Sequence, residues 1–461
     1  MNRTDTTSPT FTPPGRAWYA VGVLLLAYIF SIMDRQILTL LVGPIQKSLG
    51  VNDTMMGLLH GFTFAAFYAI MGLPISRLID RGNRRVIIAV GIALWSLATA
   101  ASGLATDFWH LLVARTGVAV GEAVLIPGAV SLLADVFSAD KRGRAMGVFG
   151  AGGPLGAGIG LLAGGLLLGV FTASPAVLPV LGELLPRQAT FVAVGLPGVF
   201  IALLMLAVPE PRLAGAARGT PTQGVPVAET VAYLKAHRTC FTAALLGVGF
   251  YTLTIYAWAG WTPTYFVREL GWTYPQIGKA LGVIITIAGP VGVLTATGLA
   301  DFWRRKGIAH ANLRVGALCC AGMAITSTGM VYAGNPVLTI VFLTLAASFS
   351  FSLLGVGPSI IQDTAPAPMR GQVAALYTGT LNIIGAGFGP VAVGLLTDYV
   401  LRDPSKVGLA IVITCVTAGT IGVLIFRSGF ATYATTRAAA AEWREKTLVP
   451  APAPTGVAPA H

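Results

Sequence analysis

Residues 80–85 read Asp80-Arg81-Gly82-Asn83-Arg84-Arg85, and residues 301–307 read Asp301-Phe302-Trp303-Arg304-Arg305-Lys306-Gly307. Each segment begins with an aspartate, continues into a cluster of basic residues, and follows a long uncharged run. The first lies in the N-terminal part of the chain and the second in the C-terminal part. This pattern indicates that one structural unit occurs twice.

A second spacing also recurs in both parts. Asp135 precedes Arg142 by seven residues, and Asp363 precedes Arg370 by the same seven. Gly153-Pro154 is echoed in the same order by Gly389-Pro390. Duplicated six-helix halves, with a substrate site between them near mid-membrane, are a recurring plan of secondary transporters.

The composition excludes most soluble classes. Of the 461 residues, 55% are apolar and 10% are charged, against roughly 25% charged in soluble domains. A helix needs about 20 largely apolar residues to cross the ~30 Å hydrocarbon core of a bilayer. Uncharged or nearly uncharged stretches predict twelve membrane helices, within 17–46, 54–76, 86–106, 108–136, 145–182, 188–209, 239–267, 280–300, 315–362 (two helices, divided at Asn335-Pro336), 371–397 and 407–426.

The basic residues predict the orientation. With the N-terminus inside, 22 of the 30 Lys and Arg lie in cytoplasmic segments and six outside, as the positive-inside rule requires. We therefore expect an all-α protein of the inner (plasma) membrane, with two pseudo-symmetric six-helix bundles and both termini cytoplasmic. The expected parts are an N-terminal tail (1–16), the two bundles (17–208 and 239–428), a central cytoplasmic loop between them (209–238), and a cytoplasmic tail (429–461) whose Pro/Ala-rich end is disordered.

On these motifs the chain resembles the major facilitator superfamily over about residues 17–428. The 80–85 segment is similar to that superfamily's signature loop, with Asn83 where glycine is usual. Three stretches are most similar to the spinster family of lysolipid and sphingolipid transporters: Met33-Asp34-Arg35-Gln36, Arg115 through Gly121-Glu122-Ala123, and Trp261-Thr262-Pro263. The resemblance implies a monomer that works by alternating access.

Four charged residues fall within predicted membrane helices: Asp34, Arg35, Arg115 and Glu122. A charge at mid-bilayer costs roughly 2.5–3.5 kcal/mol, so it normally faces the bundle interior and has a partner. We expect one balanced cluster that binds a substrate headgroup and carries a proton, as the spinster resemblance implies. A permanent clasp between helices 1 and 4 is the structural alternative. Pro127 should bend helix 4 just past Glu122.

The second half offers neutral groups instead. The predicted substrate-lining residues are Tyr251, Thr254, Tyr256, Trp258, Ser359 and Asn382. A cavity charged on one wall and apolar on the other suits an amphipathic molecule. The superfamily resemblance implies that the repeated loops close the cytoplasmic side, so the predicted gate residues are Asp80, Arg84, Asp135, Arg142, Asp301, Arg304, Asp363 and Arg370.

The sequence thus predicts a proton-coupled carrier of an amphipathic, lysophospholipid-like or sphingolipid-like compound in the lipid bilayer. A small organic-anion or sugar-acid symporter on the same fold is the alternative. An ion channel or a membrane enzyme is disfavoured, because neither repeated pore-lining polar residues nor a catalytic motif is present. The four cysteines lack metal-ligand spacing, so we expect no metal. We also expect no cofactor, with a proton gradient as the energy source. The net charge of +12 is distributed by topology and predicts no nucleic-acid partner.

Overall fold

The computed structural model describes residues 13–178, 182–211 and 225–448. The N-terminal segment 1–12 and the Pro/Ala-rich end, expected to be disordered, lie outside these residues. The helices are α1 (Pro14–Leu40), α2 (Val42–Leu49), α3 (Asp53–Gly57), α4 (Thr63–Arg81), α5 (Arg84–Gly103), α6 (Phe108–Glu122), α7 (Leu125–Val136), α8 (Ala139–Gly150), α9 (Gly152–Ala173), α10 (Pro186–Met205), α11 (Val227–Ala236), α12 (Arg238–Arg268), α13 (Tyr274–Arg305), α14 (Ala311–Tyr332), α15 (Pro336–Thr364), α16 (Arg370–Thr380), α17 (Phe388–Leu395), α18 (Val407–Ser428) and α19 (Phe430–Leu448). The strands are β1 (Ala176–Leu178) and β2 (Gly182–Leu184).

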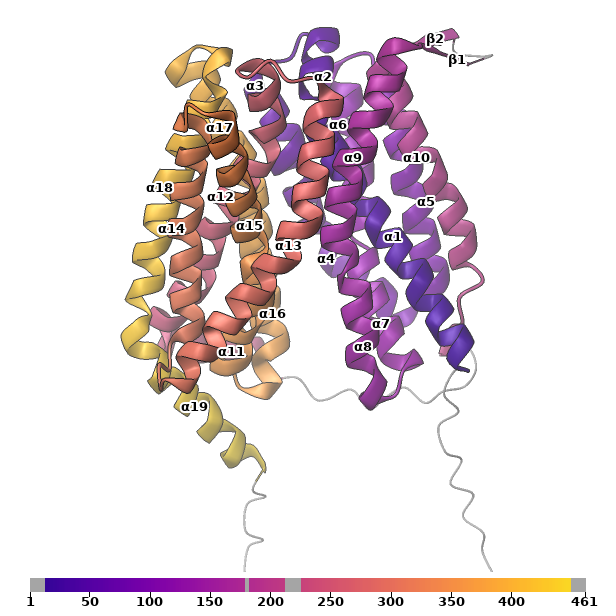
Figure 1. The fold of residues 1–461 in the computed structure, drawn as a ribbon. Coiled ribbons are helices and arrows are strands. Elements are labelled where there is room, and N and C mark those ends of the chain that lie inside the picture. The colour runs from indigo at the N-terminus through magenta and orange to yellow at the C-terminus, as the bar shows by residue number, and fades with distance from the viewer. Residues whose placement is uncertain (1–12, 179–181, 212–224, 449–461) are drawn as a thin grey trace, which may run out of the picture.

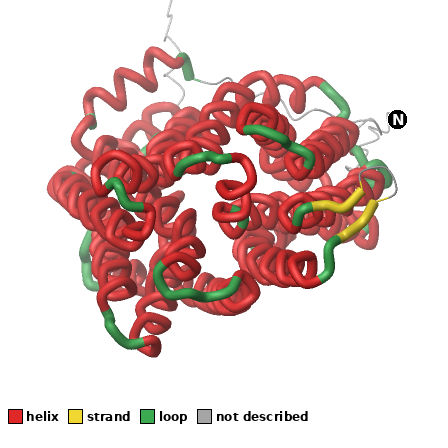
Figure 2. The backbone as a smooth tube through the Cα atoms, turned by 90° about the horizontal axis from the view of Figure 1, so that it is seen from above, coloured by secondary structure: helices red, strands yellow, loops and turns green. Residues whose placement is uncertain are grey.

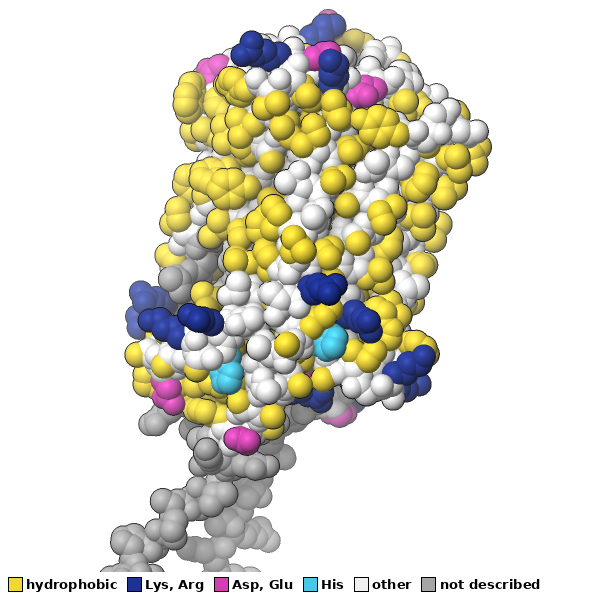
Figure 3. Space-filling view, turned by 90° about the vertical axis from the view of Figure 1, so that its left-hand side faces the viewer, with side chains coloured by type: hydrophobic (Ala, Val, Ile, Leu, Met, Phe, Trp, Pro, Cys, Tyr) yellow, Lys and Arg dark blue, Asp and Glu magenta, His cyan; other side chains and the backbone are white. Residues whose placement is uncertain are grey.

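Twelve spans among the described residues are long and apolar enough to cross a membrane, which confirms the number predicted from sequence. Figure 3 shows why a bilayer suits this surface: hydrophobic side chains cover the middle of the face, and charged side chains gather towards its two ends. In lipid a span must satisfy its own backbone hydrogen bonds, which a helix does. Helices therefore make up nearly all of the described fold, and Figure 2 shows the one pair of strands among the described residues at the margin of the bundle.

The spans form two groups, α1–α10 and α12–α18, which meet at one end of the molecule and diverge at the other (Figure 1). We call the end that carries β1 and β2 the hairpin end. The opposite end, which carries α8 and α11, is the basic end. Where the two halves meet, α9 of the first half packs closely against α13 of the second. A Cβ added at Gly282 would lie only 2.7 Å from the carbonyl oxygen of Gly158, so it is glycine that permits this close approach.

Proline residues explain where two spans break. Pro127 cannot donate a backbone hydrogen bond to the turn before it. Accordingly α6 ends at Glu122 and α7 begins at Leu125, which confirms the predicted bend. Helix 1 was expected to reach residue 46 but ends at Leu40, and the separate α2 begins two residues before Pro44.

Three further segments differ from expectation or go beyond it. The loop after α9 contains the antiparallel β1–β2 hairpin. Its strands are too short for a periodic sequence pattern to predict them. The expected central loop contains the helix α11. The tail continues as the helix α19, where its alanine-rich sequence favours helix formation.

The second and the eleventh membrane spans, Asp53–Gly72 and Ala367–Leu401, contain wider turns. Residues Leu58–Phe62 and Leu381–Gly387 are π-helical, and a Cβ at Gly61 would touch backbone oxygens at residues 386 and 387. These two segments therefore face each other across the two halves. Single π-turns inside membrane helices occur frequently at functional sites.

Candidate transport site and gates

The four charged residues of the predicted cluster form two ion pairs between α1 and α6. Arg115 donates from Nη1 to Asp34 Oδ2 at 2.7 Å. Arg35 donates to Glu122 Oε2 from both Nε, at 2.7 Å, and Nη2, at 2.5 Å. The helical register makes this possible, because Asp34 and Arg35 are adjacent on α1 while Arg115 and Glu122 are seven residues, or two turns, apart on one face of α6. The helices α1 and α6 are thus linked at two levels.

The two pairs differ in access. The side chains of Asp34, Arg115 and Glu122 are buried, whereas the Arg35 side chain is 28% exposed. Both guanidinium groups also lie over aromatic rings, Arg35 at 4.0 Å from the centroid of Phe64 and Arg115 over another ring of the same half. Cation–π attraction adds to the stabilisation of a desolvated arginine. Arg35 is therefore the member of the cluster that can meet a ligand first.

The cluster retains unused hydrogen-bonding capacity. Arg115 Nε and Nη2 and Glu122 Oε1 are buried and have no hydrogen-bond partner among the described residues. Buried polar groups are normally paired, so such atoms in a well-packed site call for an explanation such as a ligand. Two unpaired donors on Arg115 suit an anionic oxygen. Across the described ranges, no group of three or more His, Cys, Asp or Glu side chains could hold a metal.

Three of the six residues predicted to line the substrate cavity do not do so in this conformation. Tyr251 is 3% exposed, and its hydroxyl donates to the Phe349 carbonyl at 2.5 Å. Thr254 is fully buried and donates to the Tyr251 carbonyl, and Trp258 is 1% exposed. These three side chains are buried, so in this arrangement they line no open cavity. Their contact with a substrate stays a prediction.

The other three are partly accessible. Tyr256 and Ser359 are half-buried, and Tyr256 lies close enough to Arg35 to interact with it electrostatically. Asn382 is half-buried in the π-helical segment Leu381–Gly387 and donates to the Thr378 carbonyl at 2.9 Å. Tyr256 is thus the predicted residue of the second half that the structure brings to the charged cluster.

A polar network that the sequence analysis missed joins the two halves at the hairpin end. Arg268, the last residue of α12, forms two hydrogen bonds to Asp53, from Nη2 to Oδ1 at 2.7 Å and from Nη1 to Oδ2 at 2.9 Å. It also donates to Gln46 Oε1 at 2.5 Å, and Gln46 donates to Asp53 at 2.7 Å. We call Gln46, Asp53 and Arg268 the hairpin-end latch. A bidentate Arg–carboxylate pair is strong and geometrically specific.

Thr54, which follows Asp53 in α3, makes a second contact with the other half. The backbone and hydroxyl of Thr54 both donate to Asp398 Oδ2, at 2.7 and 2.6 Å. Glu269, which follows Arg268, accepts a hydrogen bond from the Gly408 amide at 2.6 Å. Burial raises the pKa of the Glu269 carboxyl despite this hydrogen bond. The helix α3 is therefore held by two segments of the other half, one at Arg268 and one at Asp398. The only sequence signal was an acid and a base at span ends on one predicted side.

At the basic end, the first signature loop is built around a buried arginine. Arg84 has a fully buried side chain that pairs with Asp135 at 2.6 Å and with Glu210 at 2.5 Å. The Arg84 amide also donates to Glu210 Oε2 at 3.0 Å. Arg142 donates to the Ala134 carbonyl. The sequence reasoning assigned Glu210 only to the start of the central loop and missed this contact.

The second half repeats this arrangement with weaker links. Arg304 pairs with Asp301 at 3.4 Å and donates to Asn312, which donates to Asp363 at 3.2 Å. The Tyr433 hydroxyl of α19 also donates to Asp363, at 3.0 Å. A further predicted gate residue, Arg370, donates to the Gln362 carbonyl at 2.6 Å.

These contacts of the predicted gate residues each stay within one half, and Asp80 lies exposed at the end of α4. Figure 1 agrees, since the halves diverge at the basic end. The described contacts thus join the halves at the hairpin end and leave them apart at the basic end.

Replacing Glu210 with glutamine is expected to destabilise the protein by about 1–3 kcal/mol, because a buried charged partner of Arg84 is lost. Thermal unfolding of the purified protein in detergent would measure this. Glu229→Gln, at an exposed acid of α11, is the matched control and should change little. Equal unfolding temperatures for both variants would show that Glu210 contributes nothing to the fold.

Comparison with known proteins agrees with this architecture. The profile of the Major Facilitator Superfamily matches residues 24–390. Among curated relatives, an MFS-type efflux pump of Mycolicibacterium smegmatis is 26% identical over 424 residues, which cover 91% of this chain and 94% of the relative. Human protein spinster homolog 1 is 28% identical over 85% of this chain and 75% of its own length. A probable L-galactonate transporter of Escherichia coli is 24% identical over 88% of each.

Among solved structures, a bacterial homolog of the human lysosomal transporter Spinster, in an inward-facing and unoccupied conformation, superposes with a TM-score of 0.73. The two are 22% identical, and the match covers 94% of this chain and 99% of the other. At this identity the likeness concerns the fold.

Proposed function

Because this chain belongs to the major facilitator superfamily and is similar to its spinster members, we propose that it is a proton-coupled carrier of an amphipathic organic anion or zwitterion, lysophospholipid-like or sphingolipid-like, working by alternating access. It is a multi-pass membrane transporter by fold. We place it in the inner (plasma) membrane, with the basic end and both termini in the cytoplasm, acting as a monomer without a cofactor or a catalytic step.

The observation that carries the proposal is the asymmetry between the halves. The first half presents two buried ion pairs with unused donors on Arg115. The residue of the second half that lies near Arg35, Tyr256, carries no formal charge. A headgroup that bears phosphate or carboxylate would satisfy those donors, whereas its apolar tail would need an apolar surface.

A second observation is an open apolar groove. It is lined by Phe62, Ala65, Ala66 and Ile70 of the second membrane span and by Ile383 of the π-helical segment Leu381–Gly387. Its lining is almost wholly apolar, and it lies between the two halves. An apolar groove between the halves supports a substrate whose tail stays in an apolar environment.

Proton coupling is supported by the pairing itself. An acid that pairs with arginine in one conformation and loses that partner in another has a different proton affinity in each. Binding that differs between states shifts the conformational equilibrium. A proton and a substrate that act on the same two pairs are therefore thermodynamically coupled.

Substrate-dependent proton flux in proteoliposomes tests the proposal. The purified protein would face a panel of lysophospholipids, sphingoid bases and small organic acids, with a pH-sensitive dye inside and protein-free liposomes as the leak control. We expect flux with an amphipathic member of the panel. Flux only with sugar acids would replace the lipid substrate by the alternative that the E. coli relative represents.

A further inference from the structure

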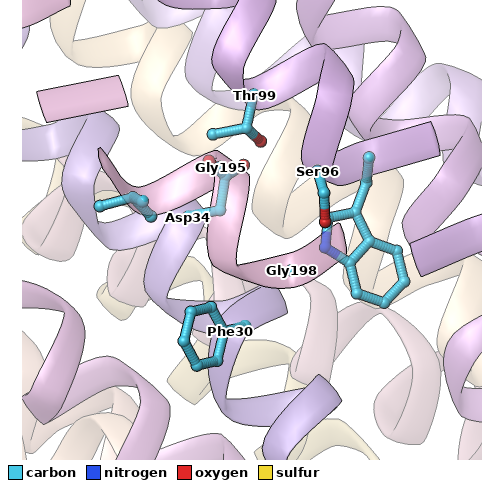
Figure 4. A pocket seen from close by; sticks show the side chains of 8 residues that line it. Phe30, Asp34, Ser96, Thr99, Gly195 and Gly198 are labelled. Atoms are coloured by element: carbon cyan, nitrogen blue, oxygen red, sulfur yellow. The ribbon is translucent and has the colours of Figure 1, made fainter. Parts of the chain in front are cut away.

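Asp34 lines a small cavity to whose lining Arg115 does not belong. The cavity lies among α1, α5 and α10 in the first half and has room for about one water molecule. Figure 4 shows Asp34, Ser96 and Thr99 around it, with Phe30 on another side. We call it the Asp34 cavity. It is separate from the apolar groove between the halves.

Three oxygen atoms around this cavity are unpaired. Asp34 Oδ1, Ser96 Oγ and Thr99 Oγ1 are each buried and have no hydrogen-bond partner in the part of the chain that the structure describes. Their residues are only 1–2% exposed. An unsatisfied buried polar group costs about 1–3 kcal/mol, so three such atoms around one cavity indicate a bound partner.

The two hydroxyls behave unlike others in these helices. In a membrane helix a serine or threonine usually satisfies its hydroxyl by donating to a carbonyl one turn earlier. Ser102, on the same helix α5, does so to Ala98 at 2.9 Å, and Thr116 of α6 does so to Leu112 at 2.9 Å. Ser96 and Thr99 do not, although their helix offers the same carbonyls. Their rotamers leave them available to a ligand in the cavity.

Charge decides which ligand fits. Arg115 lies 2.7 Å from the other oxygen of Asp34 and neutralises it. A desolvated cation would then sit beside a guanidinium without excess negative charge, which is costly in a low dielectric. A neutral molecule that both donates and accepts meets no such penalty. Buried waters typically make two to four hydrogen bonds to polar groups, and the cavity supplies three.

We propose that the Asp34 cavity binds one water molecule, which donates to Asp34 Oδ1 and is held by the hydroxyls of Ser96 and Thr99. Through this water the two hydroxyls act as positioning residues: they fix the carboxylate so that Oδ2 meets Arg115. The water site stands on the geometry alone, whereas the positioning role rests on the proposed function.

Radiolytic hydroxyl-radical labelling tests the water site without any substrate. An X-ray pulse creates radicals from water, and side chains next to a bound water are oxidised even when buried. Trp95 lines the cavity and is 3% exposed. Trp261 is 0% exposed and donates to the Pro390 carbonyl, so it is a dry internal control.

We expect Trp95 to be oxidised several-fold faster than Trp261, and the combined Ser96→Ala, Thr99→Val variant to lose this excess. Ser102→Ala is the matched control and should keep it. Equal oxidation of Trp95 and Trp261 in the unmodified protein would overturn the water site. Loss of labelling when NaCl replaces choline chloride, together with a sodium-dependent rise in unfolding temperature that Thr99→Val abolishes, would show a cation site instead.

The positioning role has its own readout. Thr99→Val removes the hydroxyl at constant shape, whereas Thr99→Ser keeps it. With the panel member that gives proton flux, we expect Thr99→Val to reduce the flux about 5-fold or more, within the range of typical coupling energies, and Thr99→Ser to restore most of it. Full flux in Thr99→Val with labelling lost would refute the positioning role and leave the water site. If no panel member gives flux, the proposed function fails and the labelling result still decides the site.

Discussion

Glu122→Gln is expected to uncouple transport from the proton gradient and to reduce substrate-driven proton flux by about 5- to 150-fold, the span of typical coupling free energies of roughly 1–3 kcal/mol. Glu122 is buried, and its Oε2 accepts both hydrogen bonds from Arg35. Glutamine keeps the shape but cannot carry a negative charge or release a proton. It also leaves the Arg35 guanidinium without its counter-charge.

The measurement is the proteoliposome assay, with Asp34→Asn as the parallel change in the other ion pair. Glu183→Gln, at an exposed acid of the hairpin, is the control for the general effect of a lost carboxylate. If the ion pairs only hold α1 and α6 together, Glu122→Gln should lower the unfolding temperature and leave the number of protons moved per substrate unchanged. That pattern would remove the proton-carrying role from the cluster.

Opening of the hairpin-end latch is expected to have the second largest effect. Arg268→Ala should shift the population by about 10-fold or more towards conformations in which the hairpin end is open, since charged hydrogen bonds contribute roughly 1.5–3 kcal/mol and about 1.4 kcal/mol is a factor of ten. The Asp53 side chain is 2% exposed, so removal of the arginine leaves a poorly solvated carboxylate. That carboxylate gains solvation when the halves separate.

Electron–electron resonance distances between spin labels would report the shift. Suitable sites are Trp109→Cys and Val337→Cys, at exposed positions on opposite halves, and the four native cysteines are buried. Lys406→Ala is the control, because its pair with Asp403 lies within one half and is exposed. Asp53→Asn combined with Arg268→Ala should add little to either change alone. Unaltered distances in Arg268→Ala would mean that the remaining contacts, Thr54 with Asp398 and the close packing of α9 on α13, are enough to close this end.

The sequence predicted the large features for physical reasons that act locally. Uncharged runs of about 20 residues are dictated by bilayer thickness, and the cost of a buried charge brought attention to Asp34 and Glu122 before any contact was known. The break after Glu122 followed from the missing amide of Pro127. Each of these inferences needs only neighbours along one helix.

The features that were missed depend on contacts between distant segments. Asp53 and Arg268 are 215 residues apart and share no repeated spacing. Glu210 follows a proline and has the composition of a loop, yet it is buried against Arg84. The faces of α12 are apolar all round, so its sequence could not show that Tyr251 and Trp258 pack inward while Tyr256 faces the first half.

The contact of Glu210 with Arg84 has a consequence for how the two bundles are joined. One margin of the central segment is fastened to the first half through Glu210, and the other is fastened to the second half where Gln372 donates to the Val225 carbonyl at 2.7 Å. Each bundle therefore has its own anchor for the chain that joins it to the other. A movement of one bundle against the other can leave both anchors intact, because Glu210 moves with the first bundle and Val225 with the second.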